Sequence, residues 1–105
     1  MTFFKTQPII ESLKLPVRYS QLTPQVRWQI RMEYRERQKD LCWFCHKDLN
    51  SFPATKIAEL PIDKTLFPPE FFNYPVHLHH DHTTDLTLGA VHAHCNAILW
   101  QYHGE

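Results

Sequence analysis

The clearest hydrophobic period along the chain predicts a helix from Pro24 to about Lys39. Apolar side chains recur there every four residues, as along one face of an α-helix, at Val26, Ile30 and Tyr34. Thr23 favours this start, because a threonine side chain can accept a hydrogen bond from an amide of the first turn and proline suits that turn.

The last third of the chain predicts two short strands followed by a helix. Residues 76–80 alternate sufficiently between apolar and polar for a strand, and residues 88–91 can return as a second strand after a polar loop at 81–87. A helix is then favoured from His92 to about Tyr102, and Gly104 ends it. The order is therefore strand, loop, strand, helix.

Proline interrupts any long helix in the two remaining segments. Residues 1–22 show no strong period and predict an arm packed on the domain. Five prolines between residues 50 and 75 predict an extended insertion, with room for a short edge strand at Ile57–Leu60. We expect this insertion to form one wall of a functional site. Its aromatic side chains either fill a small core, the favoured interpretation, or stack on bases: Phe67, Phe71, Phe72 and Tyr74.

The predicted helices and strands give an α+β fold class, and length and composition indicate one globular domain with an uneven charge. A chain of 105 residues with 43% hydrophobic content has room for a single core. Residues 1–40 hold eight Lys/Arg and four acids, a charge of +4, whereas residues 41–105 hold three and seven, a charge of −4. Three arginines repeat along the predicted helix, as a solvated face or as a contact for phosphates: Arg27, Arg31 and Arg35.

No feature of the sequence points to a membrane or to secretion. No apolar run approaches the roughly 20 residues that span a bilayer, and Met1-Thr2-Phe3-Phe4-Lys5 lacks the layout of a signal peptide. An odd number of cysteines with C-x-x-C spacing fits metal binding in a reducing compartment better than disulfides. We therefore expect a cytoplasmic protein.

Two closely spaced ligand pairs predict a structural zinc site. Cys42 and Cys45 form one pair, and His92 and Cys95 form a second at the same spacing. Structural zinc prefers four such ligands in a tetrahedron, and the site can contribute on the order of 10 kcal/mol to folding. The alternative is two buried cysteines with unrelated histidines nearby.

A second group of polar side chains remains outside this predicted zinc site: His77, His79, His80, His82, His94 and Asn96. Strand alternation places His77 and His79 on one face and His80 on the other, so neighbouring histidines can bind a metal and approach a water. Nitrogen and oxygen ligands with open positions suit Mg²⁺, Mn²⁺, Ni²⁺ or catalytic Zn²⁺, and such an ion can act on a phosphoryl oxygen.

These motifs resemble the HNH endonucleases of the ββα-metal, or His-Me finger, class. The segments H-L-H-H-D-H and G-A-V-H-A-H-C-N-A-I-L-W-Q-Y-H-G-E are similar to bacteriophage members, including the recombination endonuclease VII group. The resemblance covers about residues 24–105. It implies a zinc-stapled endonuclease domain at 23–105, after the N-terminal arm, and DNA as the partner. Phage relatives act as homing nickases or beside the DNA-packaging machinery.

The resemblance also implies a role for individual residues. His80 is the general base that activates water, and His79 and Asn96 hold one catalytic divalent metal. His82 and His77 contact the phosphate or orient the base. A histidine at position 79 replaces an aspartate of many relatives, which favours transition metals over Mg²⁺. The middle asparagine of the HNH pattern has no clear counterpart, and Thr87 or a nearby backbone carbonyl is a candidate substitute.

The resulting hypothesis is a metal-dependent DNA endonuclease that leaves 5′-phosphate and 3′-hydroxyl ends. A non-catalytic, zinc-stabilised nucleic-acid-binding module is the alternative. A zinc metalloprotease is disfavoured because no H-E-x-x-H helix is present. The sequence does not predict which bases are recognised, whether one or both strands are cut, or whether the chain dimerises.

Overall fold

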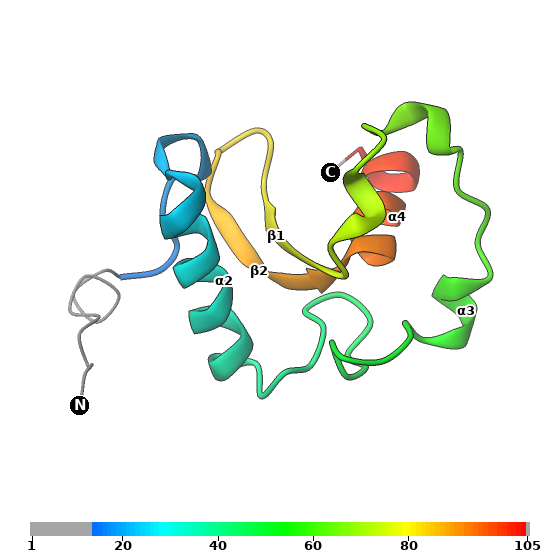
Figure 1. Cartoon of the computed structure of the whole chain (residues 1–105), viewed down its shortest axis with the longest axis horizontal. Coiled ribbons are helices and arrows are strands. Elements are labelled where there is room, and N and C mark those ends of the chain that lie inside the picture. Colours follow the sequence, from blue (N-terminus) through cyan, green and yellow to red (C-terminus); the bar gives the residue numbers. More distant parts are fainter. Residues whose placement is uncertain (1–13, 105) are drawn as a thin grey trace.

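A two-stranded sheet in the centre of the molecule separates a long helix from a C-terminal helix (Figure 1). The computed structural model describes residues 14–104. Helix α2 spans Pro24–Arg37, strand β1 Val76–His80, strand β2 Thr87–His92 and helix α4 Ala93–His103. The fold is α+β, and its strand–strand–helix order is the predicted one.

Helix α2 begins as its cap predicts and ends two residues early. The Thr23 side chain accepts a hydrogen bond from the Val26 amide at 3.3 Å, and the helix buries Ile30 and Tyr34. The predicted end at Lys39 is wrong because that residue has a positive φ of 56°. The side-chain amide of Gln38 instead bonds the backbone of strand β2, where its oxygen accepts from the Ala90 amide at 2.9 Å.

The two strands pair in antiparallel fashion, from Val76 opposite His92 to His80 opposite Thr87. The predicted strand at 76–80 is confirmed, and β2 is longer than predicted by one residue at each end. A register shift lies between His79 and His80. Gly89 in β2 is required by close packing, because a Cβ there would lie 2.8 Å from ring atoms of Trp43.

Helix α4 follows β2 without a loop, since His92 is both the last strand residue and the helix N-cap. The predicted helix is confirmed with its bounds shifted by one residue at each end. Gly104 ends it as predicted, in the left-handed conformation with φ of 73°, and its amide bonds the Trp100 carbonyl at 3.0 Å.

The described part of the N-terminal arm packs on the domain as predicted. Arg18 forms a bridge with Leu86, and the Tyr19 amide donates to the Asp85 carbonyl at 2.7 Å. Apolar arm residues contact the core: Leu15, Val17, Tyr19 and Leu22. The remainder of the predicted arm, residues 1–13, lies outside the described residues.

The insertion forms short helical turns rather than the expected extended chain. Helix α3 spans Thr55–Ala58, and 3-10 turns η2 and η3 span Lys64–Leu66 and Phe71–Asn73. The edge strand considered at Ile57–Leu60 is wrong, because the Ala58 amide bonds back to the Ala54 carbonyl at 2.8 Å. The prolines limit helix length but do not prevent single turns.

The insertion aromatics divide between two environments. Phe67, Phe71 and Phe72 contact one another with ring centroids 4.7–5.8 Å apart, and Phe67 also meets Trp100 of α4. They form the small cluster that the sequence favours. Tyr74 does not join it and remains 68% exposed.

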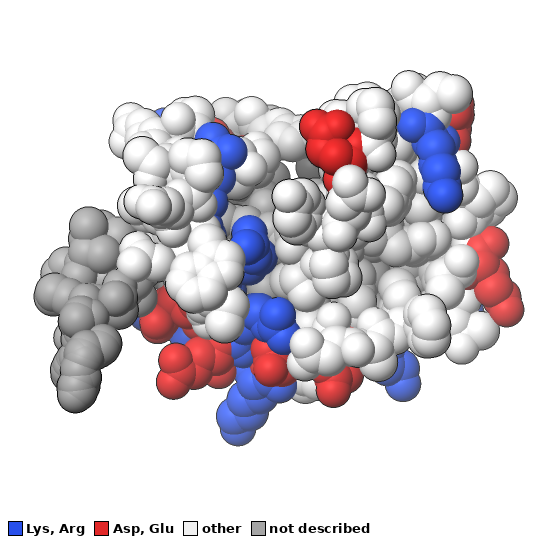
Figure 2. Space-filling view, in the orientation of Figure 1, with Lys and Arg blue, Asp and Glu red and all other residues white. Residues whose placement is uncertain are grey.

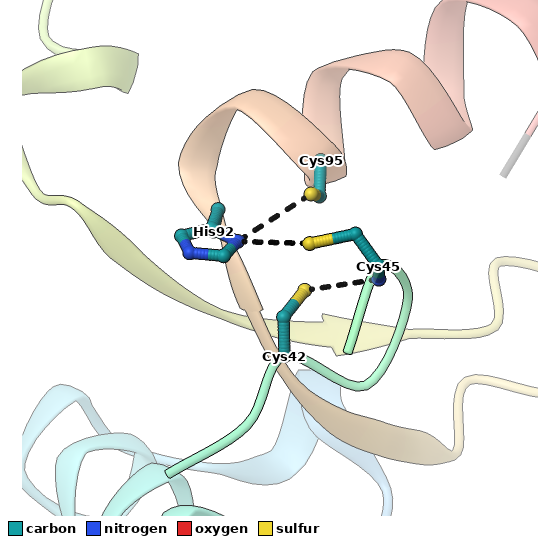
Figure 3. Close-up of side chains that lie close together, drawn as sticks. All are labelled: Cys42, Cys45, His92 and Cys95. Atoms are coloured by element: carbon teal, nitrogen blue, oxygen red, sulfur yellow. Dashed lines mark hydrogen bonds between the residues drawn. The ribbon is translucent and has the colours of Figure 1, made fainter. Parts of the chain in front are cut away.

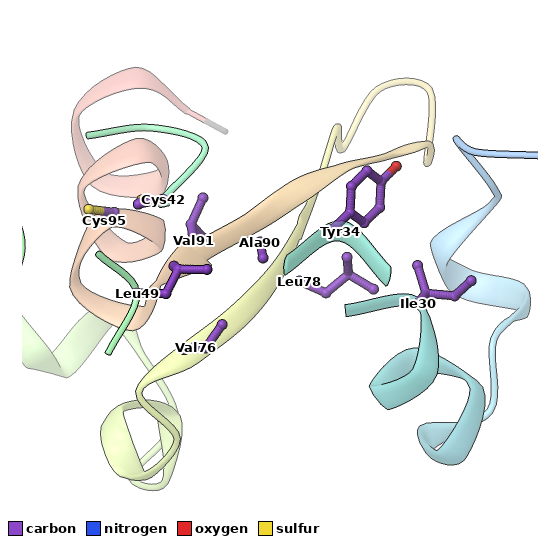
Figure 4. Packing of buried hydrophobic residues seen from close by; sticks show 9 residues of the cluster. All are labelled: Ile30, Tyr34, Cys42, Leu49, Val76, Leu78, Ala90, Val91 and Cys95. Carbon is purple, nitrogen blue, oxygen red and sulfur yellow. The ribbon is translucent and has the colours of Figure 1, made fainter. Parts of the chain in front are cut away.

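One hydrophobic core runs through the molecule along the sheet (Figure 4). Ile30, Tyr34 and Leu78 occupy the end near α2, and Val91 with the cysteines occupies the end near α4. The cluster comprises Ile30, Tyr34, Cys42, Leu49, Val76, Leu78, Ala90, Val91 and Cys95. No helix in the part of the chain that the structure describes has the length and apolar character needed to cross a membrane.

Candidate metal centre and histidine groove

Three cysteines and one histidine converge where β2 meets α4, as the sequence predicts (Figure 3). We call this the Cys3His cluster: Cys42, Cys45, His92 and Cys95. Its ligand atoms all lie within 4.8 Å of one another, and His92 Nδ1 is 3.5 Å from the sulfurs of both Cys45 and Cys95. Zinc bonds in a tetrahedron separate nitrogen and sulfur by about 3.5 Å, so the cluster could hold a zinc ion.

A tight turn after helix α2 presents the first two sulfurs. The Cys42 amide donates to the Lys47 carbonyl at 2.8 Å, and the His46 amide donates to the Cys42 carbonyl at 2.9 Å. The amides of Phe44 and Cys45 approach the Cys42 sulfur at 3.4 and 3.5 Å. These amides place partial positive charge beside a sulfur that would bind metal as a thiolate.

His92 is oriented by a backbone carbonyl that the sequence does not predict. Its Nε2 lies 2.8 Å from the Asp48 carbonyl oxygen. Because a carbonyl can only accept, Nε2 carries the proton and Nδ1 faces the sulfurs with its lone pair. Fixing the second ring nitrogen in this way is typical of histidines that bind metal.

Two thiols of the cluster have pKa values shifted in opposite directions. A hydrogen bond with Cys95, aided by nearby amides, lowers the pKa of Cys42. The same hydrogen bond and burial raise the pKa of Cys95. One thiolate therefore disfavours a second, which is the repulsion that a divalent cation relieves when thiolates bind it.

A second polar cluster lies between β1 and α4, where Asn96 connects two histidines. Asn96 Oδ1 is 3.2 Å from His79 Nδ1, and Asn96 Nδ2 is 3.1 Å from His77 Nδ1. His77 Nε2 donates to the Phe71 carbonyl at 2.9 Å, which leaves Nδ1 to accept from the asparagine amide. The shared partner agrees with the prediction that His77 and His79 lie on one strand face.

His80 lies against the N-terminal arm. Its ring stacks on Tyr19 with centroids 3.9 Å apart and planes 7° apart, and the His82 ring lies 4.8 Å away. Burial, followed by the charges of His82 and His79, lowers the pKa of His80. The imidazole is therefore neutral near pH 7 and able to accept a proton. The sequence pattern does not predict this contact, because Tyr19 lies 61 residues before His80 in the chain.

Thr87 does not occupy the orienting position that the sequence suggested for it. Its hydroxyl lies 2.8 Å from the Tyr34 hydroxyl and accepts from the Val17 amide at 3.0 Å. These contacts attach the arm and helix α2 to β2. The ring of Tyr19, rather than Thr87, stacks on the His80 imidazole.

A groove with a cavity volume of about 740 Å³ runs between helix α2, strand β1 and the insertion. We call it the histidine groove; its polar lining includes Arg27, Arg31, His77, His80, His82 and Asn96. Figure 2 shows Lys and Arg side chains along a hollow between α2 on the left and the insertion on the right. The insertion supplies a wall, as predicted, through Leu66, Phe67 and Phe71.

The predicted arginine stripe is divided by the structure. Arg27 and Arg31 line the histidine groove, and the Arg27 guanidinium lies 4.4 Å from the centre of the Tyr19 ring. Arg35 is directed elsewhere: it pairs with Asp40 at 2.6 Å and donates to Asn50 at 2.8 Å. His94 is also set apart, because its Nε2 donates to the Ile57 carbonyl at 2.8 Å.

Comparison with models of known protein families, with curated proteins and with solved structures gives no match. The function is therefore inferred from the residues described above.

Proposed function

We propose that this chain is a metal-dependent DNA endonuclease of the HNH, ββα-metal type. The observation that carries the proposal is the arrangement of His79, His80 and Asn96. Two of them bring a nitrogen and an oxygen to 3.2 Å, while the third presents a neutral imidazole to the adjoining groove. The strand–strand–helix order around them is the one that the family resemblance implies.

In this proposal the Cys3His cluster holds a structural zinc ion and has no catalytic role. Four protein ligands are typical of structural zinc, because catalytic zinc keeps one position open for water or substrate. It connects the turn after α2 to the junction of β2 and α4, and so fixes the start of the helix that carries Asn96.

A catalytic divalent ion would be held by His79 and Asn96. Adjacent ligands about 2.1 Å from an octahedral ion lie about 3 Å apart, which the distance between His79 Nδ1 and Asn96 Oδ1 approaches. When bound, such an ion supplies Lewis-acid stabilisation to the phosphate and to the leaving oxygen.

The chain's own side chains perform the remaining steps. His80 accepts a proton from a water whose oxygen attacks phosphorus. The bond to the 3′ oxygen breaks, leaving a 5′-phosphate and, after protonation, a 3′-hydroxyl. Arg27 and Arg31 in the groove contact the backbone phosphates, and His82 beside His80 contacts the scissile phosphate.

The proposal is tested by incubating supercoiled plasmid with the zinc-loaded chain and Mg²⁺, Mn²⁺ or Ni²⁺. We expect nicking that His80→Ala reduces by about 100-fold or more, the typical contribution of a general base. His103→Ala is the matched control, because His103 is an exposed histidine in the last turn of α4. Its nicking should equal that of the unmodified chain.

Two outcomes would contradict the proposal. Nicking that persists unchanged in His80→Ala would exclude this residue as the base. DNA binding without cleavage in any of the three metals would favour the alternative, a zinc-stabilised nucleic-acid-binding module, which needs no general base.

A further inference from the structure

We propose that the histidine groove binds an unpaired DNA strand, whose bases stack on Trp28 and Trp100. This inference deepens the proposed function and depends on it, because it names the form of DNA that reaches His80. Three observations support it: the groove is lined by aromatic side chains, it carries little charge, and its aromatic and charged residues line the same groove as the histidines.

Large aromatic side chains line the groove and remain open to solvent. Trp28 is 55% exposed, Trp100 45% and Tyr74 68%. They come from α2, α4 and the segment before β1, so one cavity gathers aromatic faces from three separate parts of the chain. Exposed aromatic surface concentrated at a groove is typical of a binding site.

The charge of the groove is positive but small. Among the described residues that line it there are two arginines and no carboxylate. Proteins that bind duplex DNA through its backbone gain affinity from each phosphate that a Lys or Arg neutralises, and two arginines can neutralise only a few phosphates. Arg27 and Arg31 therefore suit a short stretch of one strand, and most of the affinity must come from other contacts.

Base stacking can supply those contacts only if the bases are unpaired. In a duplex each base face is covered by the next base pair, so an indole ring cannot reach it without opening the stack. A single strand exposes its bases, and aromatic grooves with a few cations bind such strands with little sequence preference.

Arg27 lines the histidine groove beside the stack of Tyr19 and His80. Its guanidinium lies over the face of Tyr19, whose ring stacks on His80. A phosphate beside Arg27 would therefore lie near the base that is proposed to activate water.

Binding is measured with the full zinc-loaded His80→Ala chain, so that no strand is cut. Fluorescein-labelled single strands and the duplex formed from them are titrated in buffer of fixed salt. We expect the single strand to bind at least about tenfold more tightly. Trp28→Ala and Trp100→Ala should each weaken single-strand binding by about tenfold, within the range measured for stacking residues.

Phe52→Ala is the matched control, because Phe52 is 88% exposed and lies outside the groove; its affinity should be unchanged. Trp28→Phe preserves a stacking face and should retain most of the affinity. Circular dichroism of each variant identifies any loss of folding.

Tighter binding of the duplex, tryptophan variants that match the control, or equal losses in Trp28→Phe and Trp28→Ala would overturn the inference. Plasmid nicking by the unmodified chain tests the proposed function separately. A chain that nicks duplex DNA without any need for the tryptophans keeps that function and loses this inference. A chain that binds single strands through the tryptophans but never cleaves DNA keeps this binding site and loses the proposed nuclease function.

Discussion

Asn96 of helix α4 contacts two histidines of strand β1. Its amide nitrogen donates to His77, and its oxygen meets His79. The two ends of one side chain thus contact two imidazoles, and only the oxygen end would bind the proposed catalytic metal. Substitutions at this position can separate the two roles.

Replacing Asn96 by aspartate or by alanine should give different metal-dependent activities. Aspartate keeps an oxygen beside His79 and adds negative charge, which favours a hard cation such as Mg²⁺. We expect Asn96→Asp to retain Mg²⁺-dependent nicking and Asn96→Ala to lose it by about 100-fold. Single-turnover rates measured across Mg²⁺ concentrations make the comparison, and equal rates for both variants would contradict it.

Tyr19 positions His80 through ring stacking rather than by a hydrogen bond. Such a contact is worth about 0.5–1.5 kcal/mol, so Tyr19→Ala should slow nicking by roughly twofold to tenfold. Tyr19→Phe keeps the ring and should retain the rate. Because the residue is expected to act on kcat, saturating DNA should not restore Tyr19→Ala; full recovery under saturation would show a role in binding alone.

At the level of elements, hydrogen bonds join the N-terminal arm to the β1–β2 loop. The Ser20 amide and hydroxyl both bond the Asp85 carboxylate, and the hydroxyl contact is 2.5 Å long. These hydrogen bonds lower the pKa of Asp85. The charge state of this carboxylate therefore contributes to the attachment of the segment that carries Tyr19, beside its backbone and core contacts.

Acid should loosen this attachment. A carboxylate whose pKa is lower in the docked state stabilises docking above its ordinary pKa, near 3.8, and the contribution is lost as pH falls through the lowered value. We expect amide hydrogen exchange at Tyr19 and Ser20, corrected for intrinsic rates, to lose protection below about pH 4. Asp85→Asn should remove this pH dependence. Protection in the unmodified chain that stays constant down to pH 3 would contradict the assignment.

Across the whole molecule, the features that the sequence predicts are those set by local hydrophobic periodicity or by the spacing of metal ligands. The helix at Ile30 and Tyr34, the strand at 76–80 and the four members of the Cys3His cluster all follow from periodicity or ligand spacing, and the structure confirms their placement. The sequence does not predict the orienting carbonyls of Asp48 and Phe71, because every residue has a carbonyl and only the fold selects one.

Contacts between distant segments were missed for a related reason. The Tyr19–His80 stack and the Thr87–Tyr34 contact join residues more than 50 positions apart. Proline density correctly indicated a broken insertion, yet it did not distinguish extended chain from the single turns at Thr55–Ala58 and Phe71–Asn73. Each such turn is closed by local backbone hydrogen bonds, such as that from the Ala58 amide to the Ala54 carbonyl, which the sequence pattern does not reveal.

Zinc removal should unfold the chain as a whole. Among residues 14–104 the core rests on one two-stranded sheet, and a structural zinc site can supply on the order of 10 kcal/mol. We expect a strong chelator to abolish the helical circular dichroism signal and zinc to restore it, with Mg²⁺ alone ineffective. Cys95→Ser should behave like the chelated chain. Retention of cooperative thermal unfolding after complete zinc removal would contradict a stabilising role.

The most direct test of the account is to locate a second ion. Crystals of the zinc-loaded chain grown with excess Mn²⁺ should give an anomalous peak specific to manganese about 2.0–2.3 Å from His79 and Asn96, separate from the zinc peak in the Cys3His cluster. Manganese density that is absent from His79 and Asn96 at saturating concentration would contradict the catalytic metal site on which the proposed nuclease depends.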